Sequence, residues 1–110
     1  MDESYFHYAE EVDLCLRLRQ EGASIGWCCS TVVWHAVGGS LAHRSAGAHY
    51  YKSRNKVLLA RRRGVRLWTS PRLVKDEATF AVLASRDGQL RAWGHGLRDG
   101  IRGVTGRWAT

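Results

Sequence analysis

No stretch of this sequence approaches the roughly 20 consecutive apolar residues that a membrane-spanning helix requires. The first residues, Met-Asp-Glu-Ser-Tyr-Phe, also lack the basic and apolar segments of a secretory signal peptide. There are three cysteines, two of them adjacent, and no Cys-x-x-Cys pair, which argues against a disulfide framework and against a redox motif. We therefore expect reduced thiols in a cytoplasmic protein whose membrane contact, if it has one, is peripheral at the inner face of the cell membrane.

Internal repeats and low-complexity stretches are also missing, and 110 residues suffice for one small domain with a core. Acidic residues become scarce beyond residue 35. Residues 1–35 carry a net charge of −4 and residues 36–110 a net charge of +11. A basic surface of this size favours an anionic partner such as phosphate, nucleic acid or acidic lipid.

The spacing of apolar residues predicts helices through most of the chain. Residues 8–22 have helical spacing and end at Gly22, where a helix C-cap belongs. Ser70 and Pro71 are typical of a helix start, with serine as N-cap and proline in the first turn. Two further helices are expected over residues 46–63 and from Ser70-Pro71 roughly to residue 85. A weaker helix is expected from residue 90 onward, where Gly94, Gly96, Gly100 and Gly103 each lower its stability.

Between the first two helices, residues 25–36 are rich in β-branched and aromatic side chains and run into a glycine pair, which is typical of one or two strands. A strand pair alone is marginal and leaves unpaired edges. We therefore expect the chain to be the C-terminal part of a larger α/β domain whose earlier strands complete the sheet.

Two acidic residues, Glu10 and Glu11, stand side by side at the start of the first helix. Acidic side chains there complement the helix dipole, worth about 0.3–1 kcal/mol, but a carboxylate can also act as an acid or base. Asp13 and Arg17 lie four residues apart, which suits an intrahelical ion pair, with substrate contact as the alternative. Spacing alone favours the dipole and the ion pair.

Three segments, "DESYFHYAEEVDLCLRLRQEG", "SIGWCCSTVVWHAVGGS" and "YYKSRNKVLLARR", carry a longer pattern. It runs from an Asp-Glu start through two aromatics, an acidic pair and an Asp-Leu-x-x-Arg helix to a histidine followed by small residues. These residues are Asp2, Glu3, Tyr5, Phe6, Glu10, Glu11, Asp13, Leu14, Arg17 and His35. From residue 2 to about residue 63 the pattern resembles the C-terminal half of bacterial glycosyltransferase family 2 enzymes, especially the rhamnosyltransferase-like branch.

The resemblance implies a GT-A fold, which is α/β and Rossmann-like, with a nucleotide-binding half and an acceptor-binding half. The first half carries an Asp-x-Asp motif for the metal and the nucleotide-sugar, and this sequence has neither that motif nor an early βαβ unit. The expected structure is therefore an incomplete GT-A domain, a short strand pair with three to four helices, without the nucleotide-binding half. Residues 1–65 are the expected acceptor-side catalytic part, and residues 66–110 a basic helical tail.

The resemblance also implies roles for individual residues. Glu11 is the expected catalytic base, with Glu10 beside it, in an inverting transfer of a sugar from a nucleotide-sugar donor to a saccharide or lipid-linked acceptor during polysaccharide synthesis. His35 is the expected ligand of a divalent metal, Mg²⁺ or Mn²⁺, at the leaving diphosphate. Asp13 and Arg17 are the expected substrate contacts. We expect the 110-residue chain alone to be inactive, because the other half supplies most ligands of the donor and metal.

Other interpretations stay open for parts of the chain. The Arg-rich run "RRRGVR" would suit a nucleic-acid-binding module, although the first third is acidic and we expect no nucleic-acid partner, and a noncatalytic remnant is a third class. Arg54 and Asn55 could lie near the diphosphate or only support packing. A zinc site is disfavoured by ligand spacing; its ligands would be Cys15, Cys28, Cys29 and His43.

The last predicted helix has an apolar stripe beside a basic one. Such a helix binds anionic membranes or packs on the rest of the protein, and we favour packing. The apolar stripe is Leu90, Trp93, Leu97 and Ile101, and the basic residues are Arg91, Arg98 and Arg102.

Overall fold

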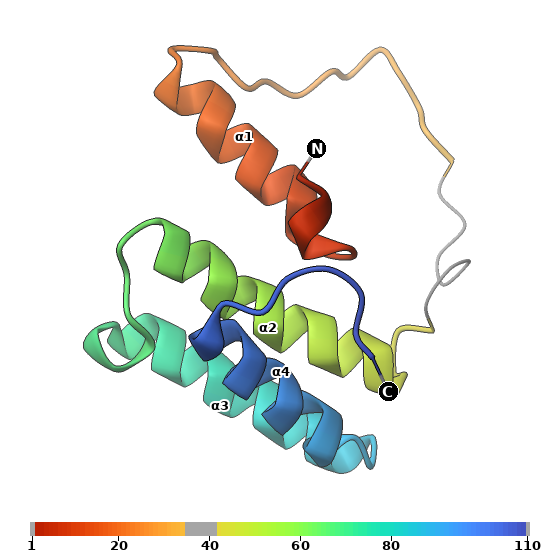
Figure 1. Ribbon diagram of the computed structural model, residues 1–110. Coiled ribbons are helices and arrows are strands. Elements are labelled where there is room, and N and C mark those ends of the chain that lie inside the picture. The colour runs from red at the N-terminus through yellow and green to blue at the C-terminus, as the bar shows by residue number, and fades with distance from the viewer. Residues whose placement is uncertain (1, 35–41, 110) are drawn as a thin grey trace.

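The computed structural model describes residues 2–34 and 42–109. Its helices are α1 (Glu10–Gln20), α2 (Ala46–Arg62), α3 (Pro71–Arg86) and α4 (Leu90–Arg102), with short 3-10 helices η1 (Glu3–Tyr5) and η2 (Leu67–Thr69). The helices α2, α3 and α4 pack side by side, and we call them the three-helix body (Figure 1). The helix α1 lies apart from this body and makes few contacts with it (Figure 1).

The expected α/β class is wrong, because the described residues contain helices and no strand. Residues 25–34, where the sequence predicts strands, form no regular backbone ladder with another segment. A strand forms only where a neighbour supplies partners for its N–H and C=O groups, and no described segment of this chain does so. The expected strand pair, and with it the incomplete Rossmann-like GT-A domain, is therefore not what residues 2–34 and 42–109 form. Residues 35 and 36 of the predicted strand lie outside the described residues.

The predicted helices are confirmed, with ends that differ by no more than two residues. The hydroxyl of Ser70 accepts a hydrogen bond from the backbone N–H of Leu73 at 3.4 Å, and Pro71 occupies the first helical position. The helix α2 begins in the same way, with Ser45 as its N-cap. The helix α4 ends at Arg102, and its C-cap Gly103 has a φ of 80°, a left-handed conformation that glycine adopts at little cost.

Two glycines of α4 permit its close contact with α2. A Cβ atom added at Gly96 would overlap the backbone carbonyl of Tyr50, and one at Gly100 would lie 2.7 Å from the carbonyl oxygen of Arg54. The two helix backbones therefore touch at positions where any larger residue would separate them. Glycine weakens a helix in isolation, but here it allows the packing that holds the three-helix body together.

The centre of the core is α2, and the C-terminal segment covers it. The hydroxyl of Tyr50 donates to Asp99 of α4 at 3.0 Å, and the Tyr50 ring stacks on Trp108 with the ring centres 4.4 Å apart. The backbone N–H of Trp108 donates to the hydroxyl of Tyr51, and that of Gly106 donates to the carbonyl of Ser4. The C-terminal segment thus runs over α2 and joins the N-terminal segment to it (Figure 1).

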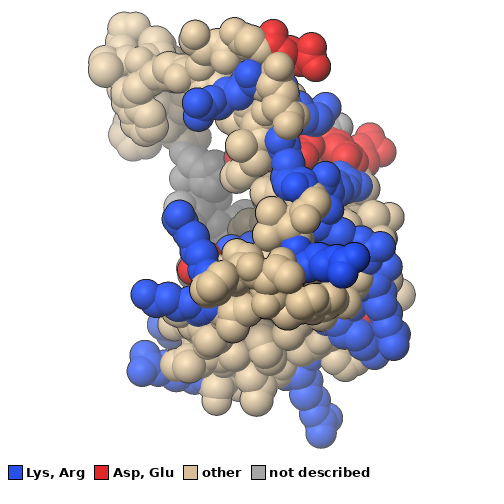
Figure 2. Space-filling view, turned by 90° about the vertical axis from the view of Figure 1, so that its left-hand side faces the viewer, with Lys and Arg blue, Asp and Glu red and all other residues tan. Residues whose placement is uncertain are grey.

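Charge is distributed unevenly over the structure. Figure 2 shows Lys and Arg side chains over much of the three-helix body, while the larger acidic groups lie in the upper part of the view, at the level of α1. The acidic first third of the sequence therefore forms an end of the molecule different from the basic remainder.

Candidate functional site

The buried side chains of Arg54 and Asn55 on α2 hold the segment that precedes α1, and we call them the Arg54–Asn55 clamp. The Arg54 guanidinium donates to the carbonyls of Tyr5 and Gly106, both at 2.6 Å, and to Oδ1 of Asn55 at 2.8 Å. The Asn55 amide nitrogen lies 2.9 Å from the carbonyl oxygens of Tyr5 and Tyr8. Neither clamp residue is exposed to solvent, so both act inside the protein and do not reach a ligand at its surface.

The clamp supports an unusual backbone conformation just before α1. Phe6, Tyr8 and Ala9 have φ angles of 61°, 65° and 72°. Residues with side chains rarely adopt this region, which costs of order 1–3 kcal/mol at each position and persists only where surrounding contacts fix it. Ala9 is also the residue that caps α1. The clamp therefore sets where α1 starts and where its first carboxylates lie.

Asp13, on α1, joins this helix to the segment that precedes it. It is buried and accepts hydrogen bonds from the Tyr5 hydroxyl at 3.3 Å and from Nε of Arg17 at 2.9 Å. The intrahelical ion pair that the spacing predicts is thus confirmed. Contact of Asp13 and Arg17 with a substrate stays a prediction, and of the two only Arg17, half-exposed, lies at the surface.

The two adjacent carboxylates differ in environment. Glu11 is exposed and lines an open cavity of about 370 Å³ beside α1. Glu10 is partly buried, and its Oε2 atom is enclosed with no hydrogen-bond partner among the described residues. Burial, and secondly the negative charge of Glu10, raises the pKa of the Tyr8 hydroxyl above its ordinary value. Glu11 is therefore the carboxylate that a substrate can reach, as a base requires.

A second, basic pocket of about 240 Å³ lies at the start of α2. Its lining residues are His43, Arg44, His49, Lys52, Phe80, Leu83, Arg86 and Asp87. Nζ of Lys52 lies 3.3 Å from Nδ1 of His43 and 5.2 Å from the centre of the Tyr8 ring, so the pocket adjoins the segment that the clamp holds. Burial lowers the pKa of Lys52. Because its cationic groups outnumber its one carboxylate, the pocket suits an anion.

The single acidic group of this pocket is already occupied by two neighbours. Oδ2 of Asp87 lies 2.9 Å from Nε2 of the buried His49, and its Oδ1 lies 3.5 Å from Nε of Arg44. Asp87 therefore fixes the walls of the pocket, and its charge is balanced within the wall.

The expected metal ligand, His35, lies outside the described residues, so its role stays a prediction. Within residues 2–34 and 42–109, no three His, Cys, Asp or Glu side chains come together in a way that could hold a metal ion. Cys15, Cys28 and Cys29 are free thiols.

The apolar stripe of α4 is partly covered by its neighbours. Nε1 of Trp93 donates to Oε2 of the buried Glu77 on α3 at 3.1 Å, and Leu97 is half-buried. This arrangement agrees with the packing alternative for the stripe. None of the helices in the described part of the chain combines the length and the apolar character needed to cross a membrane.

No protein-family model, curated protein or solved structure matches this chain.

Proposed function

We propose that this chain is the acceptor-side part of an inverting sugar transferase. In this proposal Glu11 takes the proton of an acceptor hydroxyl while the hydroxyl attacks the anomeric carbon of a nucleotide-sugar, on the face opposite the departing nucleotide. The observation that carries the proposal is the connection between two distant stretches of the motif. The clamp in "YYKSRN" holds the "SYFHY" segment, and Glu11 follows that segment at an open cavity.

A catalytic base must lie within about 2.6–3.2 Å of the proton it removes, which demands a rigid support. Here Glu11 is supported in two ways. The clamp holds the segment before α1, and Tyr5 and Arg17 donate hydrogen bonds to Asp13 within α1. The helix start then projects the Glu11 carboxylate toward the cavity without burying it. The acceptor, a saccharide or a lipid-linked saccharide, would occupy that cavity.

The basic pocket complements the other reactant. A nucleotide-sugar carries a diphosphate, and Lys52, His43 and Arg44 offer donors to such a group next to Tyr8. Their positive charge would stabilise the leaving diphosphate as negative charge develops on it. The divalent metal expected there, Mg²⁺ or Mn²⁺, would add to this stabilisation, with His35 as its expected ligand.

An uncovered apolar surface supports the need for a second, nucleotide-binding part. Trp27 and Trp34 are each 93% exposed, and Val32 and Val33 between them are also largely exposed. Exposed apolar patches are typical of surfaces that contact another protein, a membrane or a ligand. In the proposed enzyme this surface contacts the nucleotide-binding part, in the cytoplasm, where the thiols stay reduced.

The test is sugar transfer by the chain alone and by the chain joined to a nucleotide-binding half of a family 2 enzyme. We expect no turnover above a no-protein control for the chain alone and measurable transfer for the joined protein, with a panel of nucleotide-sugars and saccharide acceptors. Turnover by the chain alone would contradict the dependence on a second part. A folded joined protein that binds donors without transferring any sugar would contradict the transferase role.

Salt-dependent binding to random oligonucleotides tests the rival class in the same preparation. A nucleic-acid-binding module binds them tightly and loses affinity as salt rises. The transferase proposal predicts no binding at physiological salt.

A further inference from the structure

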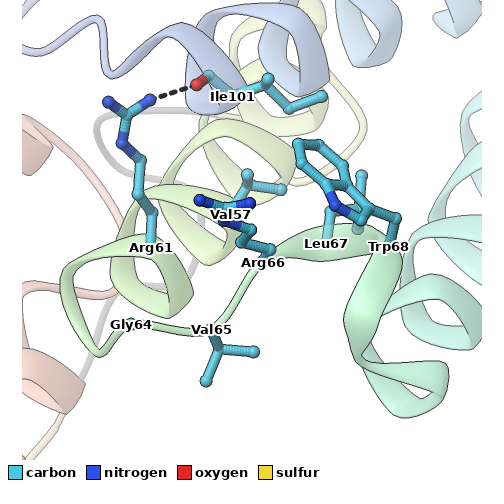
Figure 3. Close-up of a pocket in the computed structure, with 8 residues that line it drawn as sticks. All are labelled: Val57, Arg61, Gly64, Val65, Arg66, Leu67, Trp68 and Ile101. Atoms are coloured by element: carbon cyan, nitrogen blue, oxygen red, sulfur yellow. Dashed lines mark hydrogen bonds between the residues drawn. The ribbon is translucent and has the colours of Figure 1, made fainter.

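A cavity of about 630 Å³ opens at the end of α2, remote along that helix from the basic pocket, and the described residues that line it include no acid. Its lining residues are Val57, Arg61, Gly64, Val65, Arg66, Leu67, Trp68 and Ile101 (Figure 3). They come from the last turns of α2, the connection to η2, η2 itself and the end of α4. We call this the arginine–tryptophan cavity.

The two arginines of the cavity differ in what they contact. Arg61 donates to the backbone carbonyl of Ile101, which joins the end of α4 to α2 (Figure 3). The Arg66 guanidinium lies between Arg61 and Trp68 in the same view. Neither arginine forms an ion pair with a carboxylate of the described residues. The cavity therefore presents positive charge that the described part of the protein does not neutralise.

The remaining walls are apolar and accessible. Trp68 is 65% exposed, and Val65 and Ile101 are also exposed. A tryptophan with an apolar body and a polar N–H beside uncompensated arginines is a combination found where proteins meet the headgroup region of a lipid layer. A phosphate accepts paired hydrogen bonds from a guanidinium, while apolar walls favour hydrocarbon.

We propose that the arginine–tryptophan cavity binds a phosphate monoester that bears an alkyl chain, such as the headgroup and first methylenes of an anionic lipid. The phosphate lies against Arg66 and Arg61, and the chain lies along Trp68, Val65 and Ile101. Charge complementarity identifies the phosphate, and the five apolar lining residues identify the chain. This site does not depend on the sugar-transfer proposal.

The site also differs in position from the apolar stripe of α4, for which membrane contact was the alternative to the favoured packing. Ile101 is the one member of that stripe that lines the cavity. Trp93 is bonded to Glu77 on α3 instead. The contact with an anionic lipid is therefore assigned to the end of α4 and the Arg-rich connection that follows α2.

Octyl phosphate below its micelle concentration is the first probe, with the purified full chain and calorimetric detection. Butyl phosphate, inorganic phosphate and octyl glucoside are its comparisons. We expect octyl phosphate to bind most tightly, because each methylene that the cavity buries strengthens binding by up to about fourfold. Added salt should weaken binding, because the phosphate contact is partly exposed.

Two exposed residues of the cavity can be changed with little risk to the fold. Arg66→Gln and Trp68→Ser should each weaken octyl phosphate binding by about tenfold or more. Arg91→Gln and Trp27→Ser remove the same side-chain types outside the cavity and should leave binding unchanged. Thermal unfolding of all four variants confirms that each is folded.

The same variants are then compared by flotation with vesicles of phosphatidylcholine, with and without phosphatidic acid. Binding only to vesicles with phosphatidic acid, lost in the two cavity variants, supports the site with a membrane lipid as its source. Binding of octyl phosphate without vesicle binding supports the site with a soluble phosphate monoester as its source. Equal affinity of the wild type and Arg66→Gln for octyl phosphate would overturn the proposal. Binding of inorganic phosphate or octyl glucoside as tight as that of octyl phosphate would overturn it as well.

Discussion

Arg54→Met removes the cation that holds the N-terminal segment onto α2, while keeping a long side chain in its place. Three hydrogen bonds of 2.6–2.8 Å are lost, which leaves the carbonyls of Tyr5 and Gly106 and the Asn55 side-chain oxygen without this donor. A buried acceptor without a partner costs about 1–3 kcal/mol. Part of this cost is offset because no guanidinium must then be taken out of water. We expect a net loss of about 3–5 kcal/mol of unfolding free energy.

Such a loss is a large fraction of the roughly 5–15 kcal/mol that stabilises a domain of this size. Urea unfolding followed by circular dichroism measures it. Arg91→Met, at an exposed position of α4, is the control and should change the unfolding free energy by no more than about 0.5 kcal/mol. Arg54→Lys keeps the charge but not the planar donor geometry, so its unfolding free energy should lie between those of the wild type and Arg54→Met. A loss under about 1 kcal/mol for Arg54→Met would refute the clamp.

Three further predictions concern a close backbone contact, a buried carboxyl group and a hydrogen-bonded thiol. Gly96→Ala should lower the unfolding free energy by about 1–3 kcal/mol, because the added Cβ overlaps the backbone of α2. Gly94→Ala, with open space around the added Cβ, should raise the unfolding free energy by about 0.5–1 kcal/mol. Equal effects of the two changes in urea unfolding would contradict the close contact. Burial raises the pKa of Glu77 above its ordinary value of 4.5, so the folded chain holds a proton that the unfolded chain has lost, and stability falls as the pH rises from 4.5 through the folded pKa. Glu77→Gln should remove this fall and be more stable than wild type at neutral pH. If the unfolding free energies of the two proteins changed with pH in parallel, the raised pKa of Glu77 would be contradicted. Hydrogen bonds from neighbouring hydroxyls, first that of Ser30, lower the pKa of the exposed Cys28 thiol to about 7. The alkylation rate of Cys28, followed by peptide mass spectrometry, should therefore reach half its maximum near pH 7. In Ser30→Ala this midpoint should move to higher pH. An unchanged midpoint would contradict the hydrogen bond with Ser30 as the cause.

The helices could be predicted because their signals are local. The apolar spacing, the Ser70-Pro71 start and the glycine Gly22 that follows α1 each act within a few residues, and the structure has helices there. The predicted strands in residues 25–34 failed for the opposite reason. Their composition suits a sheet, but a sheet needs a partner segment that composition cannot supply.

The candidate site could be predicted only in part. The acidic pair is visible in the sequence as a motif. The difference in burial between its two members, with Glu11 exposed and Glu10 partly buried, depends on tertiary contacts and could not be predicted. For Arg54 the sequence offered support of packing as one of two alternatives, but it could not reveal the partners, because they are backbone carbonyls far away in the sequence. Likewise, Gly96 reads as a weak point of a helix until the position of α2 is known.

The role of Glu11 is tested most directly by kcat of the Glu11→Gln variant, in the chain joined to a nucleotide-binding half. This change keeps the size of the side chain but prevents it from accepting a proton. We expect kcat to fall by about 10²–10⁴-fold with donor Kd nearly unchanged, and Glu10→Gln to cost less. A near-normal kcat for Glu11→Gln, with a stability change under about 1 kcal/mol, would show that the two carboxylates only complement the helix dipole.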